Sequence, residues 1–235
     1  MRIAGLQKLT LLDFPDKTAA TVFTAGCNLR CPFCHNAELV YTSAQEPNET
    51  LSEEDFFAFL KSRRGLLDGV CITGGEPLLQ PGLDTFCNKI KEEGFAVKLD
   101  TNGFFPDRLQ ALISAQLIDY VALDVKNHSE KYAETVGVAS LNLTPLHTTL
   151  DLLREDSVAY EFRTTVVKEY HTSDDLFALA TLIKKARAWY LQGFVDSAEV
   201  LAGHSILHPW EKEDLRAIVD PLRALIPNTF LRGQD

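Results

Sequence analysis

Long apolar runs are absent from this sequence, which has no stretch of the roughly 18 apolar residues that a membrane-spanning helix needs. The opening MRIAGLQKLTLLDFPDK carries charged side chains along its length, which argues against a signal peptide of the usual pattern. Internal repeats, low-complexity tracts and obvious linkers are missing as well. We therefore expect a cytoplasmic protein with no membrane contact, folded as one domain over residues 1–235.

Basic residues are fewer than acidic ones: the sequence has 23 Lys and Arg against 33 Asp and Glu, which gives a formal net charge of −10. An acidic surface repels a phosphate backbone, so we do not expect general nucleic-acid binding. The 46% of hydrophobic residues is ordinary for a soluble globular protein, and 235 residues suffice to bury a full core.

Cysteine is scarce, and the five present are an odd number that makes a poor disulfide framework. Cys27, Cys31 and Cys34 lie within eight residues, and in a reducing compartment such a cluster more often serves a metal or catalysis. Cys71 and Cys87 stand alone on apolar segments, and we expect them to be buried as small hydrophobic residues.

Short apolar runs alternate with segments of helical period. Nearly continuous apolar runs are typical of parallel strands that are covered on both faces. The expected strands are residues 20–24, 70–73, 96–100, 120–125, 160–167 and 189–195. The first expected helix begins at residue 53, and the others span 81–93, 106–115, 145–153 and 171–188. Residues 41–50 form a polar, turn-rich connection.

Strands that are each followed by a helix imply a parallel sheet with right-handed crossovers. Six such units cannot close the standard eight-stranded barrel. The predicted fold class is therefore α/β, an open six-stranded (β/α)6 partial TIM barrel, with a flat doubly wound sheet as the alternative.

The three clustered cysteines directly follow the first expected strand, at the carboxyl edge where active sites of parallel α/β folds gather. A structural zinc site takes four ligands, usually as two separated pairs; no second pair exists, and His35 is adjacent to Cys34 rather than spaced to converge with it. A conventional electron-transfer cluster also takes four cysteines. Three thiolates on a four-iron cube instead leave one iron open for a substrate or cofactor.

Polar residues also follow the next strands. In Thr73-Gly74-Gly75-Glu76-Pro77, the two glycines allow close backbone approach and the carboxylate offers acceptors to an ammonium group. The motifs Asp100-Thr101-Asn102-Gly103 and Asp124-Val125-Lys126 place carboxylates at the ends of apolar strands, where an unpaired charge is costly. Helix capping by Asp100 or Asn102 is the alternative. Arg163, inside the fifth strand, suits either a bidentate clamp on a carboxylate or a solvated position.

Three cysteines spaced by three and then two residues, with Phe33 before the last, resemble the signature of the radical S-adenosylmethionine (SAM) superfamily. This resemblance implies one [4Fe–4S] cluster held by Cys27, Cys31 and Cys34, with SAM bound to the open iron. Reductive cleavage of SAM would then give methionine and a 5′-deoxyadenosyl radical, while the protein supplies binding, orientation and exclusion of water.

Several continuations narrow the resemblance. His35-Asn36 after the last cysteine, the DTNG segment and the aspartate–lysine pair resemble the activating enzymes of glycyl-radical enzymes, and residues 6–15 resemble activating proteins of anaerobic ribonucleoside-triphosphate reductase. In these activases the glycine-rich motif contacts the methionine amino group. The aspartates and the threonine help hold a monovalent cation beside the methionine carboxylate, which makes Asp100, Thr101 and Asp124 the cation-ligand candidates and places Lys126 near the cofactor. The motifs support this from about residue 5 to about 126.

The resemblance yields one set of candidate site residues. The catalytic and metal-binding set is Cys27, Cys31 and Cys34. The cofactor-binding set is Phe33, His35, Gly74, Gly75, Glu76, Asp100, Thr101, Asn102, Asp124, Lys126 and Arg163. Gln192 and His204 are within reach of the site but receive no role.

The resemblance implies that the protein forms a radical on a glycine of a partner enzyme, and the expected partner is an anaerobic ribonucleoside-triphosphate reductase. The expected electron donor is a flavodoxin or a ferredoxin-like protein. The alternative is a small-molecule enzyme of the 7-carboxy-7-deazaguanine synthase type. Those enzymes tend to follow the last cysteine with Asp-Thr, where this chain has His35-Asn36. A non-enzymatic iron–sulfur carrier is a third reading, but it leaves the glycine-rich and acidic strand ends unexplained.

Overall fold

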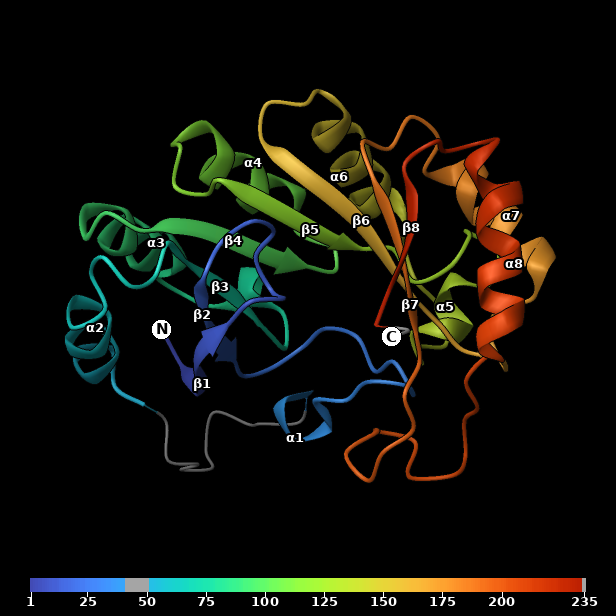
Figure 1. The fold of residues 1–235 in the computed structure, drawn as a ribbon, viewed down its shortest axis with the longest axis horizontal. Coiled ribbons are helices and arrows are strands. Elements are labelled where there is room, and N and C mark those ends of the chain that lie inside the picture. Colours follow the sequence, from blue (N-terminus) through green and yellow to red (C-terminus); the bar gives the residue numbers. More distant parts are fainter. Residues whose placement is uncertain (41–50, 234–235) are drawn as a thin grey trace.

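The computed structural model describes residues 1–40 and 51–233, so the predicted connection at 41–50 lies outside the described residues. Its centre is an eight-stranded sheet whose strands follow one another in chain order, with helices on the outer side (Figure 1). The strands are β1 (Ile3–Thr10), β2 (Ala19–Thr24), β3 (Gly69–Gly74), β4 (Ala96–Thr101), β5 (Tyr120–Asp124), β6 (Ala159–Val166), β7 (Trp189–Gly193) and β8 (Thr229–Arg232). The helices are α1 (Ala37–Val40), α2 (Glu53–Lys61), the 3-10 turn η1 (Pro77–Leu79), α3 (Leu83–Glu92), α4 (Pro106–Ser114), α5 (Tyr132–Thr135), α6 (Thr144–Arg154), α7 (Ser173–Leu182) and α8 (Lys212–Arg223).

The open, mostly parallel α/β sheet is confirmed, and the six predicted strands correspond to β2 through β7. The sheet is wider than predicted by two strands: β1 pairs antiparallel with β2, and β8 pairs parallel with β7. Strand β1 is missed because polar residues interrupt its apolar ones, and β8 because it has only four residues. Since the order never reverses, the sheet has no switch point of the doubly wound kind.

The largest difference between predicted and observed helix bounds is at α7. The helix expected over 171–188 is α7, which ends at Leu182, because the chain leaves helical geometry beyond Ile183 and Lys185 adopts a positive φ of 70°. Its N-cap is Thr172, and a reciprocal hydrogen bond with Asp175 completes a capping box. None of the described helices has the length and apolarity that a membrane span requires.

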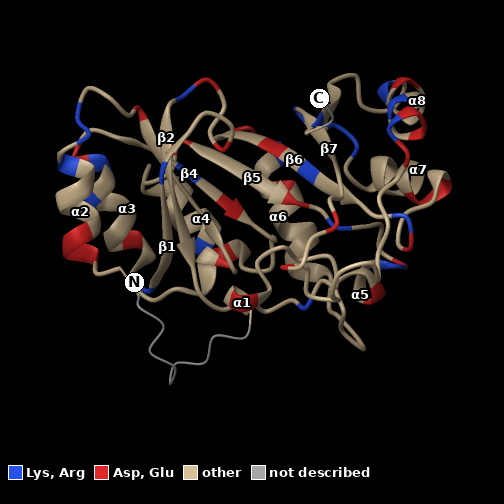
Figure 2. Cartoon of the chain, turned by 60° about the horizontal axis from the view of Figure 1, so that its bottom comes forward, with Lys and Arg blue, Asp and Glu red and all other residues tan. Residues whose placement is uncertain are grey.

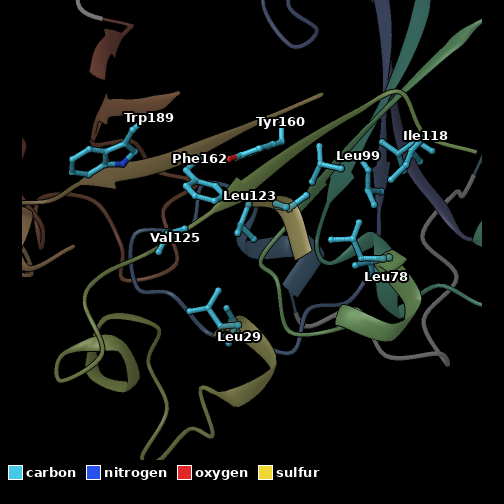
Figure 3. Close-up of a cluster of buried hydrophobic side chains, with 14 of the residues drawn as sticks. Leu29, Leu78, Leu99, Ile118, Leu123, Val125, Tyr160, Phe162 and Trp189 are labelled. Carbon is cyan, nitrogen blue, oxygen red and sulfur yellow. The ribbon is translucent and has the colours of Figure 1, made fainter. Parts of the chain in front are cut away.

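The main core lies between the sheet and the outer helices. Side chains alternate along each strand, so Leu99, Leu123 and Phe162 point toward this core (Figure 3) while the residues after them point to the concave side. Leu29, from the cysteine loop, is buried in the same cluster. The core therefore anchors one face of the strands, and the other face is free to build a site.

A buried ion pair lies on the concave side, beside the cavity described below. Glu161 is fully buried and accepts two hydrogen bonds from Arg232 at 2.8 and 2.9 Å, together with one from the Tyr120 hydroxyl at 3.1 Å. The Arg232 guanidinium also lies 3.9 Å from the ring centroid of Tyr190. Strand β8 thus contributes the arginine that pairs with this buried carboxylate.

Candidate active site

A cavity of about 350 Å³ opens on the concave side, near the carboxyl ends of the parallel strands. Its lining includes every predicted cluster and cofactor residue. Gln192 lines it too, whereas His204 is exposed and pairs with Asp196 through its Nδ1 at 2.8 Å. The roles assigned to these residues stay predictions, but the structure brings them into one place.

The cysteine loop has little regular structure and is held by distant segments. The backbone amide of Arg30 donates to the Val136 carbonyl at 3.0 Å, just after α5. The amides of Leu201 and Ala202 donate to the carbonyls of Cys34 and Pro32 at 2.9 and 2.8 Å. The sequence did not predict these backbone hydrogen bonds, because almost any residue type can form them.

The three thiols differ in exposure. Cys31 is only 8% exposed and burial raises its pKa to about 12, while burial also raises the pKa of the partly buried Cys27. Within residues 1–40 and 51–233, no three Cys, His, Asp or Glu side chains converge tightly enough to hold one metal ion. A cube of four irons binds each thiolate at a different corner, so its ligands stand further apart than those of a single zinc ion. Three cysteines around one cavity fit the larger group better.

The glycine-rich segment packs against the cysteine loop. Gly74 has a φ of 113°, and a Cβ on Gly75 would overlap the carbonyl oxygen of Gly26. The amides of Gly75 and Glu76 donate to the carbonyls of Thr24 and Gly26, each at 2.8 Å. The absence of side chains on these glycines therefore lets the backbone at Gly26, beside Cys27, approach them closely, and both glycines also line the cavity.

Glu76 joins the glycine-rich segment to the end of β4. Its Oε1 accepts from the Leu78 amide at 3.0 Å and from the Thr101 hydroxyl at 2.9 Å, and its Oε2 accepts from the Asn102 amide at 2.8 Å. The side chain is 1% exposed, and this burial raises its pKa to about 7 although the three donors act in the opposite direction.

The raised pKa of Glu76 predicts a pH-dependent stability. Between the ordinary carboxyl pKa of 4.5 and about 7 the folded state holds a proton that the unfolded state has lost, so stability should fall as pH rises through this range. The full difference is roughly 3 kcal/mol. Urea unfolding of the cluster-free protein at pH 5, 6, 7 and 8 should show this decline, and Glu76→Gln should flatten it. Identical slopes for both proteins would contradict the assignment.

A chain of buried charges crosses the ends of β4, β5 and β6, where Figure 2 shows acidic and basic segments on neighbouring strands. Arg163 donates from Nε to Asp124 at 2.9 Å and from Nη1 to Asp100 at 3.0 Å. Lys126 pairs with the other oxygen of Asp124 at 3.1 Å, and Lys98 pairs with the other oxygen of Asp100. Burial alone would raise the pKa of Asp124, but Arg163 and Lys126 hold it well below its usual range.

These contacts decide two open alternatives. Arg163 faces the cavity and not the solvent, and it bridges two carboxylates of the chain itself. Asp100 does not cap a helix, since α4 starts after Phe105 and has no side-chain cap. Asn102 does make a local turn, because its Oδ1 accepts from the Phe104 amide at 3.2 Å.

The predicted monovalent cation does not fit this arrangement. Each of the four carboxylate oxygens of Asp100 and Asp124 already faces an ammonium or guanidinium group. The Thr101 hydroxyl is engaged as well, since it donates to Glu76 and accepts from the Gly103 amide at 3.2 Å. Lys98 was not among the predicted site residues. The available signal was its position in an apolar strand, two residues before Asp100, which places both side chains on the same face of the strand.

The fold and the site together define a class of protein: an α/β partial barrel whose open end gathers three cysteines, a glycine-rich turn and charged strand ends. Residues 21–168 match the family model of the Radical SAM superfamily. This match covers more than half of the chain, and the protein belongs to that superfamily. Its characteristic cofactors are a [4Fe–4S] cluster and SAM.

Individual relatives extend the likeness. The chain is 34% identical over 200 residues to the "Putative glycyl-radical enzyme activating enzyme" of Methanocaldococcus jannaschii, covering 82% of this chain and 79% of the relative. It is 27% identical over 222 residues to the pyruvate formate-lyase-activating enzyme of Clostridium pasteurianum, covering 91% and 87%. The 7-carboxy-7-deazaguanine synthase of Thermococcus kodakarensis is 32% identical over 127 residues, covering only 47% and 49%.

A solved structure shares the fold. The structure of Streptococcus suis SuiB bound to the precursor peptide SuiA superposes on this chain with a TM-score of 0.70 at 15% identity. The match covers 91% of this chain and 48% of that one, so this chain spans about half its length. At this identity the likeness concerns the fold alone.

Proposed function

We propose that this protein is a radical SAM activase that forms a glycyl radical on a partner enzyme, and that the partner is an anaerobic ribonucleoside-triphosphate reductase. The observation that carries the proposal is a cavity that holds the three cysteines, Glu76 and the Arg163 network on the concave side of an open sheet. In the described residues β1 and β8 do not pair with each other, and a polypeptide loop would enter the cavity between these two strands.

The residues of the cavity fit the two cofactors. Cys27, Cys31 and Cys34 would hold the cluster, and its open iron and SAM, once bound, supply the 5′-deoxyadenosyl radical that removes a hydrogen atom from the glycine. The carboxylate of Glu76 would accept from the ammonium of SAM. Arg163 would attract the carboxylate of SAM and orient it.

The charged groups of the site lie on both sides of this placement. Lys98, Arg163 and Lys126 pair with the carboxylates of Asp100 and Asp124, and Glu76 also lines the cavity. The SAM carboxylate would lie beside Arg163, and the SAM ammonium beside Glu76. Phe33 and His35, beside Cys34, would complete the wall against which the nucleoside packs and would exclude water from it.

The function is tested with anaerobically reconstituted, reduced protein, SAM and the reductase. We expect 5′-deoxyadenosine and a glycyl-radical doublet in the electron paramagnetic resonance spectrum, in equal amounts, because one hydrogen abstraction consumes one SAM. A reductase variant whose radical-bearing glycine is alanine should give no doublet. Cleavage of SAM without a doublet on any glycyl-radical enzyme of the same organism would refute the activase role.

Once the doublet is observed, the physiological electron donor is identified by replacing the chemical reductant used to reduce the cluster with a flavodoxin or a ferredoxin.

A second candidate is a small-molecule enzyme of the 7-carboxy-7-deazaguanine synthase type, which the relative from Thermococcus kodakarensis favours. Its likeness covers about half of the chain, whereas the activating enzymes match most of it. Formation of 7-carboxy-7-deazaguanine by the reduced protein would support this candidate over the activase.

A further inference from the structure

The side chain of Lys98 is almost fully enclosed, at 1% exposure, in a part of the sheet where lysine is unusual. It lies two residues before Asp100 on β4, so both side chains point to the concave side. The Lys98 ammonium contacts Asp100 Oδ1 and lies 3.7 Å from the sulfur of Cys71, its register partner on β3. Cys71 and Cys87 are both buried as predicted, but Cys71 also borders this charge pair.

Lys98 provides the positive charge that pairs with one of the two carboxylate oxygens of Asp100. Arg163 serves only Asp100 Oδ2 and is shared with Asp124. Without Lys98, the other oxygen of Asp100 would face only the Cys71 thiol at 3.7 Å, which is a weak donor. A buried carboxylate oxygen in that state is costly, so some cation has to stand beside it.

We propose that Lys98 is a positioning residue whose tethered ammonium takes the place of a bound monovalent cation beside Asp100, so that SAM binding requires neither sodium nor potassium. The proposal rests on the SAM-binding function proposed above. Lys98 acts through Asp100: it keeps that carboxylate paired and oriented, and Arg163 remains aligned toward the cavity. Because the ammonium is covalently attached, the site is complete at any salt composition.

The test measures SAM affinity and not turnover, using reconstituted protein with the cluster oxidised so that SAM stays intact. Dissociation constants are determined by isothermal titration calorimetry in sodium, potassium and tetramethylammonium chloride at equal concentration. Tetramethylammonium keeps the ionic strength but is too large to enter a site built for a small ion. For the wild-type protein we expect the three constants to agree within about twofold.

The variant Lys98→Met removes the ammonium and keeps a side chain of similar length. We expect it to bind SAM at least tenfold more weakly in tetramethylammonium, and to recover most of that loss in sodium or potassium, which would enter beside Asp100. Lys89→Met, at a half-exposed lysine on α3, is the matched control and should behave like the wild type in all three salts. Iron content and circular dichroism establish that each variant is folded and loaded.

The outcomes separate the two proposals. A wild-type protein that binds SAM only with sodium or potassium would overturn the role of Lys98 and leave the activase function intact. A folded Lys98→Met protein with the same affinity in all three salts would also overturn it. If the wild type binds SAM in none of them, the proposed function fails first.

Discussion

Replacing Cys31 by alanine is expected to remove the cluster and to reduce SAM cleavage to background. The Cys31 thiol is enclosed, and burial raises its pKa to about 12, so a thiolate forms there only when metal binding displaces the proton. Changing residues that merely orient metal ligands costs about 10–100-fold. Loss of one of three ligands should therefore exceed that, measured as iron per chain and as 5′-deoxyadenosine released.

Cys87→Ala provides the matched control. Cys87 is also fully buried and burial raises its pKa to about 12, but it lies on α3 and does not line the cavity. Its alanine variant should keep both iron and SAM cleavage. Equal iron content in the Cys31 and Cys87 variants, or zinc in place of iron in oxygen-free preparations, would remove the cluster assignment.

Replacing Arg163 by methionine is expected to destabilise the cluster-free protein by about 3–5 kcal/mol, because one change leaves the buried Asp100 and the partly buried Asp124 short of a partner. Arg163 bridges Asp100 and Asp124 at 3.0 and 2.9 Å. Urea unfolding monitored by circular dichroism measures the loss. The loaded variant should also bind SAM more weakly, since it lacks the positive charge that we propose attracts the SAM carboxylate.

The same chemical change at Arg187 isolates the effect of burial. Arg187 pairs with Asp156 at 3.1 Å, but the two side chains are 55% and 60% exposed. Arg187→Met should therefore cost less than about 1 kcal/mol. Arg163→Lys keeps the charge but cannot bridge both carboxylates and should recover only part of the stability. If the Arg163 and Arg187 methionine variants unfold alike, the buried network contributes no special stability.

Local patterns were enough to predict many of the residues that line the cavity. The spacing of Cys27, Cys31 and Cys34 is a property of eight consecutive residues, and the apolar runs before Glu76, Asp100 and Asp124 mark where strands end. Parallel strands bring their carboxyl ends to one edge, so these segments converge whatever the details of packing. The prediction failed for β8, whose four residues gain stability only from pairing with β7 and covering by α8.

The sequence by itself determined the three-cysteine loop, the order of β2 to β7 with α2, α3, α4, α6 and α7 between them, and the superfamily, because each depends on residue types at short separation. Only the tertiary structure decided that Arg163 faces inward, that Lys98 occupies the position beside Asp100, and that residues 201 and 202 hold the cysteine loop. These features depend on which face of a strand is turned inward and on contacts between segments far apart in the chain. A one-residue shift of register would reverse the first two, and in nearly continuous apolar strands the pattern of residue types does not show which face is turned inward.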